Sequence, residues 1–332
     1  MTSFLSALGT KLAEKWVSLL VLPGLLFVSL CAVGAQLGHA HAWDVTRLIG
    51  RLNALADEPA ARMPGTVALT AVLVLAASTG AGLFAAAMAA WVERVWLGNW
   101  PWWLTLSLGE RMTRRRVRRW EAADRRFREE RLRLVLEDQE AERQVPTLLD
   151  ALGLGPTDPG DGPEWAPDHS LNGGIAKVAA RYETRNRIAL TRPVHPTWMG
   201  DRMAAAESRI RRAYALDLPT VWPRLWLLLP EAPRLDLHSA RADLAAAGHR
   251  AAWGVLCLVL AVWWWPAAVA ALVTGGSAWR QGRQAVDAFA LLVESAVDVH
   301  GRELVRALGA DAEAELSRES GAQVTRIVRK DD

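Results

Sequence analysis

Three long stretches of the chain contain no charged residue, and they constrain the fold more than any other feature. They cover residues 16–37, 67–90 and 251–279 of the 332-residue sequence. About 20 apolar helical residues cross the roughly 30 Å hydrocarbon core of a bilayer. Each stretch is long enough for that, although 23% of the whole chain is charged. The sequence therefore predicts an all-α, multi-pass membrane protein of the cell membrane.

The first stretch, WVSLLVLPGLLFVSLCAVGAQL, is 22 residues long and follows Lys11 and Lys15. A cleaved signal peptide also begins with basic residues, and Ala40-His41-Ala42 resembles a cleavage site. Signal-peptide cores run to about 7–15 apolar residues, so the greater length favours a retained membrane span. Both interpretations stay open from the sequence alone.

The second stretch repeats small residues every four positions, at Ser78, Gly82, Ala86 and Ala90. Small residues on one face let membrane helices approach closely. This pattern predicts a helix-packing face, although an alanine-rich composition also produces it by chance.

The third stretch contains Trp263, Trp264, Trp265 and Pro266 at its centre. One straight helix over its 29 residues would be about 43 Å long. Such a helix would also place tryptophans at the bilayer midplane, whereas tryptophan prefers the membrane–water interface. Proline interrupts a helix. We therefore expect a membrane hairpin over residues 244–283 with an outer turn at Trp263–Pro266; one tilted span and a re-entrant loop are the alternatives.

Basic residues near the ends of spans mark the cytoplasmic side of a membrane. Arg250 and Arg280 flank the third stretch, and the densest basic run, residues 111–119, follows the second. Four spans with both termini in the cytoplasm satisfy these charges. The expected parts are then an N-terminal membrane pair (residues 1–108) with a tryptophan-rich exit and a cytoplasmic helical region (109–243). The membrane hairpin follows, and then an amphipathic helix with a polar, frayed tail (284–332).

The cytoplasmic region begins with a long charged helix, expected at residues 110–143. A heptad of mostly apolar residues runs along it, made of Thr113, Trp120, Phe127 and Leu134. The alternate heptad positions are mostly polar, so the pattern predicts half of a coiled-coil seam. Gly, Pro and Asp dominate residues 153–174, which predicts a flexible linker.

The basic run on this helix is a candidate site for anionic lipid headgroups, through Arg114, Arg115, Arg116, Arg118 and Arg119. Basic residues beside a membrane each gain about 1 kcal/mol from anionic lipids. Nucleic acid is the other polyanion, and a basic run alone does not distinguish it from lipid; we do not expect it as the partner. A solvated helix face that only obeys the positive-inside rule is the plain alternative.

The segment R-x-x-x-A-Y-A-L-D-L-P-T-V-W-P-R-L, residues 209–225, precedes a charged helix and the apolar hairpin. Over residues 190–310 the chain resembles a group of uncharacterised bacterial multi-pass membrane proteins that share this segment. The resemblance implies an architecture and no activity. It marks a partner or packing segment at Tyr214, Asp217, Trp222, Pro223 and Arg224.

Motifs of known catalytic chemistry are absent from the sequence. It has neither a phosphate-binding loop nor a nucleophile elbow, and Cys31 and Cys257 have no metal-site spacing. His39 and His41 near Asp44 lack a convincing further ligand. We therefore expect no catalytic residue, cofactor or metal.

The expected function is that of a non-enzymatic membrane anchor or scaffold for a cytoplasmic complex, with a cytoplasmic protein or a second copy as partner. None of the three charge-free stretches carries Asp, Glu, Lys or Arg in its interior, which argues against a coupled transporter. An oligomeric channel is the first alternative, and a membrane-bound enzyme of unknown type is the second.

Overall fold

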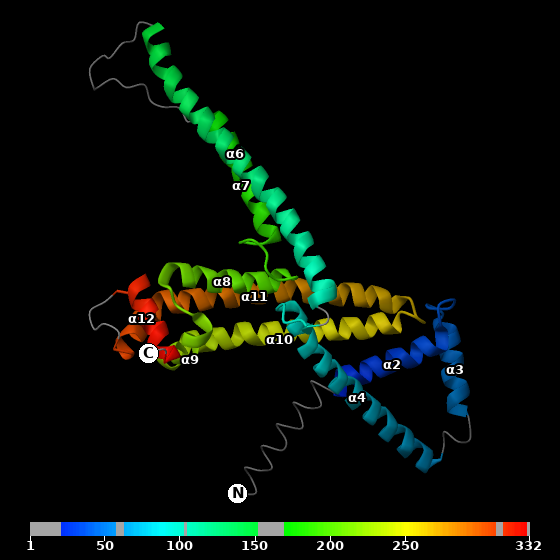
Figure 1. The fold of residues 1–332 in the computed structure, drawn as a ribbon. Coiled ribbons are helices and arrows are strands. Elements are labelled where there is room, and N and C mark those ends of the chain that lie inside the picture. The colour runs from blue at the N-terminus through cyan, green and yellow to red at the C-terminus, as the bar shows by residue number, and fades with distance from the viewer. Residues whose placement is uncertain (1–20, 58–62, 103–104, 152–168, 310–314, 331–332) are drawn as a thin grey trace. The chain divides into compact units, whose positions relative to one another are not determined.

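The computed structural model describes residues 21–57, 63–102, 105–151, 169–309 and 315–330 (Figure 1). All regular elements in these ranges are helices, which confirms the predicted all-α class. The chain divides into two compact units. The first combines the N-terminal part to Val95 with Trp222–Ala307, and the second combines Trp96–Val221 with the C-terminal part from Leu308.

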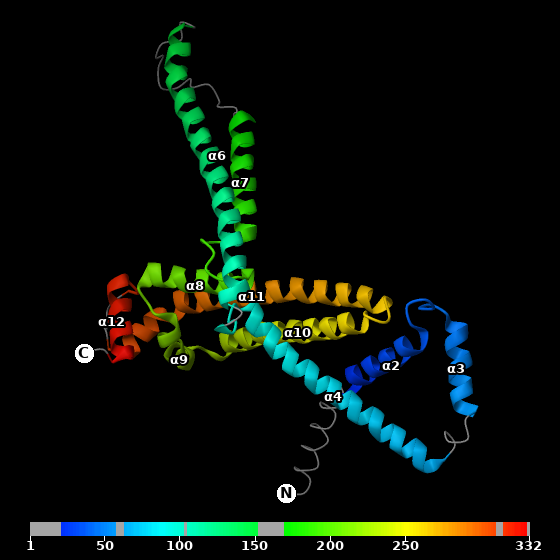
Figure 2. The ribbon, with the colours of Figure 1, turned by 45° about the vertical axis from the view of Figure 1, so that its right-hand side comes forward.

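The first unit is organised around a long antiparallel hairpin. Helices α10 (Glu231–Leu260) and α11 (Pro266–Ala307) lie side by side in both ribbon views (Figures 1 and 2). The chain reverses direction over residues 261–265, where the tryptophans precede Pro266. Proline suits the first position of a helix because its missing N–H would have no partner there. Alanines fill the hairpin interface, including Ala252, Ala267 and Ala278, which are buried.

Helix α2 (Leu22–Leu37) runs parallel to α10. The rings of Phe27 and Trp253 lie 5.9 Å apart, and a methyl group at Gly34 would lie 3.3 Å from Leu260. Both pairs join residues 226 positions apart, so the two helices keep one register over two turns. The N-terminal part of the first predicted span lies outside the described residues.

Helix α4 (Pro64–Trp96) packs through small residues. A methyl group at Gly24 of α2 would overlap with the Ser78 carbonyl, and one at Gly248 of α10 would lie 3.4 Å from the Ala89 carbonyl. The buried face of α4 starts, as predicted, with Ser78 and Gly82, but it continues through Ala85 and Ala89. The predicted continuation through Ala86 and Ala90 is wrong because a helix has 3.6 residues per turn, so a strict four-residue repeat rotates off the face.

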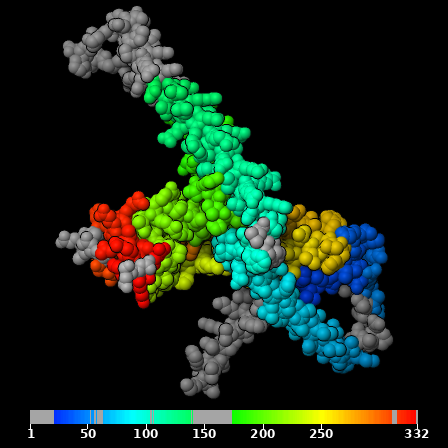
Figure 3. Space-filling model, viewed as in Figure 1, coloured from blue at the N-terminus to red at the C-terminus, as the bar shows by residue number. Residues whose placement is uncertain are grey.

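The remaining surface of α4 is apolar and exposed, and Figure 3 shows its N-terminal half without covering neighbours on the visible face. Within the described part of the chain, two helices are long and apolar enough to cross a membrane, namely α4 and α10. Only 11% of the apolar window of α4 is buried, against 39% for α10, and α2 is a shorter apolar helix. These helices support membrane association.

The connection between α2 and α4 contains helix α3 (Val45–Asp57). No helix was expected from the sequence between the first two charge-free stretches, so α3 is an addition to the predicted architecture.

The second unit begins with a short π-helical turn, η3 (Thr105–Gly109), followed by α6 (Glu110–Ala151). Helix α7 (His169–Ile188) packs back along α6. The predicted linker at residues 153–174 is too long, because α7 already includes residues 169–174; residues 152–168 lie outside the described chain. Helix α8 (Trp198–Tyr214) follows, capped by the Thr197 side chain.

Helix α9 (Leu218–Leu228) has only 11 residues, consistent with the two prolines within it, Pro219 and Pro223, and with Pro230 just after it. The predicted frayed tail is wrong: α12 (Arg318–Arg329) forms within it and buries Gly321, Val324 and Val328. A capping box of Ser317 and Ser320 begins this helix. Serine side chains satisfy backbone N–H groups that have no partner within the first helical turn.

Candidate functional site: the arginines of helix α6 and the segment under helix α12

The apolar heptad of α6 faces α7 within the same chain. The indole N–H of Trp120 donates a 2.9 Å hydrogen bond to the Ala189 carbonyl. Farther along, the rings of Phe127 and Tyr182 lie 5.6 Å apart, and a methyl group at Gly174 would overlap with Leu134. The predicted half seam is therefore the contact surface of an intramolecular helical hairpin.

Arg185 of α7 fixes the register of this hairpin. Its guanidinium lies 5.8 Å from the ring centre of Trp120, 5.2 Å from that of Phe127 and 4.8 Å from that of Tyr182. It also lies 3.3 Å from a carboxylate oxygen of Asp124, which is buried. Stacking on aromatic faces and a buried carboxylate together hold a cation in one place.

Arg116 does not belong with the predicted lipid-binding arginines. Its guanidinium donates 2.7 Å and 2.8 Å hydrogen bonds to the Asp201 carboxylate and the Ile188 carbonyl. Asp201 is buried and also accepts 2.8 Å and 2.7 Å bonds from the backbone N–H groups of Val194 and His195. Arg116 thus ties α6 to the start of α8.

The other predicted arginines point away from α7. Arg114 is exposed and paired with Glu110 one turn earlier. Of the exposed arginines on α6 that form no ion pair within the described chain, Arg131 lies on another side of the helix, and seven share one side: Arg111, Arg115, Arg118, Arg119, Arg125, Arg126 and Arg133. Because successive residues are about 100° apart around a helix, these seven fall within an arc of about 120°. We call them the basic face; it lies opposite Trp120 and Phe127.

Reasoning from the sequence found the first part of this face because arginine is dense there. It missed Arg125, Arg126 and Arg133, which are scattered along the sequence and meet only around the helix. Their helical spacing from Arg111 and Arg118 is the signal that identifies them. Asp124, Arg185 and Asp201 carried no comparable signal, because their roles come from contacts with distant segments.

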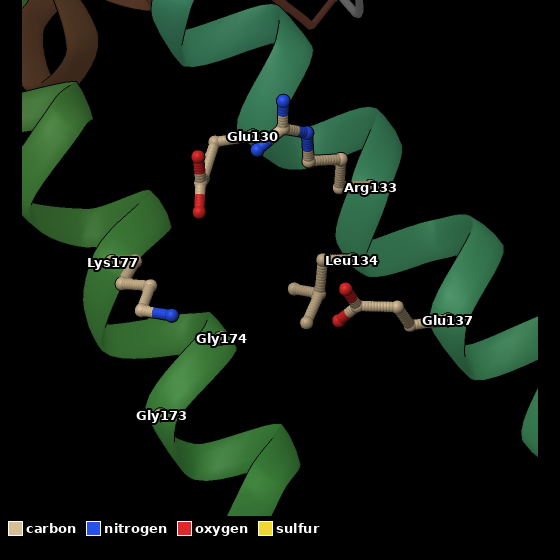
Figure 4. A pocket seen from close by; sticks show the side chains of 7 residues that line it. All are labelled: Glu130, Arg133, Leu134, Glu137, Gly173, Gly174 and Lys177. Atoms are coloured by element: carbon tan, nitrogen blue, oxygen red, sulfur yellow. The ribbon is translucent and has the colours of Figure 1, made fainter.

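A cavity of about 360 Å³ lies between α6 and α7 (Figure 4). It is lined by Glu130, Arg133, Leu134, Glu137, Gly173, Gly174 and Lys177. Figure 4 shows Lys177 reaching toward the gap from α7 and Glu130 and Glu137 reaching from α6. Two acids and two bases cancel, so the cavity has no net charge with which to select an ion.

The segment highlighted by the resemblance supports α12. The Asp217 carboxylate accepts 2.6 Å and 2.7 Å hydrogen bonds from the hydroxyl of Thr220 and the guanidinium of Arg329. The Thr220 bond and the ion pair with Arg329 hold the pKa of Asp217 below its ordinary value. The Tyr214 carbonyl lies directly against the backbone of Gly321, where a side chain would overlap with it.

Tyr214 and Asp217 are therefore packing residues of the second unit. Trp222 is half-buried and lies 6.1 Å from the ring of Trp226, while Pro223 and Arg224 are exposed on α9. The packing role therefore belongs to the first half of the predicted segment.

The described residues contain no group of three or more His, Cys, Asp or Glu that is placed to hold a metal ion. His39 uses its ring nitrogen in a 2.8 Å hydrogen bond with the Val262 carbonyl, on the turn between α10 and α11. This histidine therefore joins two connections of the first unit.

Comparisons of the chain with protein-family models, curated proteins and solved structures find no match, so the geometry alone carries the functional argument.

Proposed function

We propose that the chain is a four-span membrane protein that anchors a cytoplasmic helical module and acts as a scaffold for a cytoplasmic complex. One observation carries the membrane part: the most apolar window of α4 is almost entirely uncovered. Val67, Leu69, Val72 and Leu73 are each more than half exposed along it. Exposed apolar surface of this extent is unfavourable in water and suits the hydrocarbon of a bilayer.

Contacts at the end of α2 support two full spans in the α10–α11 hairpin. The Trp264 indole lies 3.3 Å from the Ala42 carbonyl, and His39 bonds to Val262. The hairpin turn therefore lies level with the residues that follow α2. If α2 crosses the membrane, the turn reaches the same outer surface, which a re-entrant loop would not do.

The length of α10 also supports a span that reaches the outer membrane surface. Glu93 near the end of α4 forms a 2.8 Å ion pair with Arg241 of α10. From Arg241 to Val262 is about 31 Å of helix, close to one hydrocarbon thickness. Arg250 lies within this interval and is paired with Gln281 across the hairpin. Arg250 is about 13 Å from Arg241 along the helix, near the middle of this interval, and its hydrogen bond to Gln281 satisfies part of the guanidinium there.

A cysteine-labelling experiment tests the topology. Cys31 and Cys257 are first replaced by alanine, and single cysteines are then placed at Trp263, which is 43% exposed, and at Gln323, which is exposed on α12. Ser320 is unsuitable because it is buried in the capping box. We expect an impermeant thiol reagent to label position 263 in intact cells and position 323 only after lysis. Labelling of 323 from outside would overturn the four-span topology.

The basic face is proposed to rest on anionic lipid headgroups. Fourteen residues separate its first arginine from the end of α4, so the start of this face stays near the end of the proposed span. A fluorophore at Glu129, which lies on this face, should be quenched by nitroxide lipids in anionic nanodiscs. The quenching should fade as salt shortens the Debye length from about 10 Å at 0.1 M to about 3 Å at 1 M. The same label at Arg131, exposed on another side of α6, is the control.

Equal quenching in neutral nanodiscs, or at both positions, would contradict a lipid role for the basic face.

The scaffold role itself is tested by affinity isolation of the tagged chain from native membranes, where we expect a stoichiometric protein partner. The oligomeric channel predicts selective ion flux through liposomes that contain the pure protein, and such flux would refute the scaffold.

A further inference from the structure

Helix α3 has one apolar side, and among the residues whose burial the structure describes, Val45 and Ile49 on this side are exposed while Leu48 is half-buried. In its sequence, VTRLIGRLNALAD, apolar residues recur three and four positions apart. Val45 and Ile49 lie one turn apart on this side and are 62% and 52% exposed. Arg47 lies on the opposite side of the helix and is exposed to solvent as well.

The two ends of α3 are tethered to apolar helices. Seven residues separate it from the end of α2 and six from the start of α4. Arg51 anchors it further, by donating hydrogen bonds to the backbone carbonyl and the side chain of Gln36 at the end of α2. With such short connections, α3 stays next to the ends of these two helices.

The direction of α3 also differs from that of the spans. Both ribbon views show it running across the axis of the α10–α11 hairpin (Figures 1 and 2). A helix in this direction lies along a membrane surface when the hairpin crosses the membrane. Trp43, just before α3, is 72% exposed and lies 6.0 Å from the ring of Trp265 on the hairpin turn.

From these features we infer that α3 is an interfacial helix, whose apolar side is buried in the outer leaflet at the boundary between headgroups and acyl chains. Amphipathic helices bind this boundary with the apolar side down and the polar side in water. The exposed tryptophans at the same end of the unit fit the same depth, because indole rings favour the interface. The apolar window of α4 is almost entirely uncovered, and only six residues separate α4 from α3, which favours lipid as the occupant over a protein partner.

This inference rests on the proposed membrane topology, and one experiment separates the two. Single cysteines are introduced into the full chain lacking Cys31 and Cys257, at Ile49 on the apolar side, at Arg47 on the polar side, and at Leu73 on α4. Each is labelled with an environment-sensitive fluorophore in nanodiscs. Quenching by nitroxide lipids and by aqueous iodide is then compared.

We expect the Ile49 label to be quenched by shallow nitroxide lipids and to be several-fold less sensitive to iodide than the Arg47 label. The Leu73 label should be quenched by nitroxides deep in the acyl chains. If Leu73 is quenched and Ile49 is not, α3 is not interfacial, although the spans stand. If Ile49 is protected from both quenchers, a protein surface covers it and the lipid assignment is wrong. If Leu73 itself escapes lipid quenching, the membrane topology fails.

Discussion

Replacement of Arg116 by alanine should destabilise the second unit, whereas the same change at its neighbour Arg115 should not. Arg116 keeps only 20% of its side chain exposed, and Asp201, its partner, keeps 4%. Removing one partner of a buried ion pair costs about 3–5 kcal/mol. Because Arg116 keeps some contact with water, we expect about 2–3 kcal/mol here. Arg115 is exposed and should stay within about 0.5 kcal/mol of the parent.

Thermal unfolding of the full chain in detergent, followed by tryptophan fluorescence, measures this difference. For a unit of about 150 residues, each kcal/mol lowers the melting temperature by roughly 2–4 °C. Arg116→Ala should therefore lower it by roughly 4–12 °C. Trp120 lies one turn from Arg116 on α6 and belongs to the seam with α7, so unfolding of this hairpin changes the fluorescence of at least one of the chain's 17 tryptophans.

A double-mutant cycle with Asp201→Asn identifies the cause. The asparagine side chain would retain one oxygen for the backbone N–H groups of Val194 and His195 but would lose the charge that attracts Arg116. We expect the two substitutions to be coupled by about 1–3 kcal/mol. Equal melting temperatures for Arg116→Ala and Arg115→Ala, or additive effects in the cycle, would refute the assignment of Arg116 to the interior.

Three further outcomes follow from close contacts in the two units. Gly24→Val should weaken the association of α2 with α4, because its side chain would overlap with a backbone carbonyl, whereas Gly80→Val on the open side of α4 should be tolerated; detergent-resistant folding and melting temperature compare them. Gly321→Val should detach α12 and expose it to limited proteolysis, while Gln323→Ala on its exposed side should not. The pKa of Asp217 is lower in the folded chain than in the unfolded chain, so its ionised form stabilises the docked α12 at pH values above the ordinary carboxyl pKa. This stabilisation is lost as the pH falls through the pKa of Asp217 in the folded chain. Proteolysis of α12 in acid should therefore increase, and Asp217→Asn should remove that pH dependence.

Much of the architecture followed from the order of residues alone. Charge-free stretches predicted the apolar helices, because a charged side chain is costly to place in hydrocarbon and is well solvated in water. Three tryptophans before a proline predicted the reversal between α10 and α11, because proline cannot continue a helix and can begin one. The heptad of Trp120, Phe127 and Leu134 predicted a contact surface on α6. These are local properties, so a linear sequence is enough to read them.

The tertiary structure decided what each surface touches. Arg115 and Arg116 are adjacent and chemically identical, yet one faces solvent and the other binds Asp201, 85 residues away. In the sequence, the residues of helix α12 read as a polar tail. The contacts of this helix with Tyr214 and Asp217 form only in the folded chain, and the Tyr214 contact shows why Gly321 must be small. No helix was expected from the sequence between the first two charge-free stretches, and only the helical turns of α3 bring Val45 and Ile49 together on one side. A side chain's partner depends on segments that are distant in sequence, and that information exists only once the chain has folded.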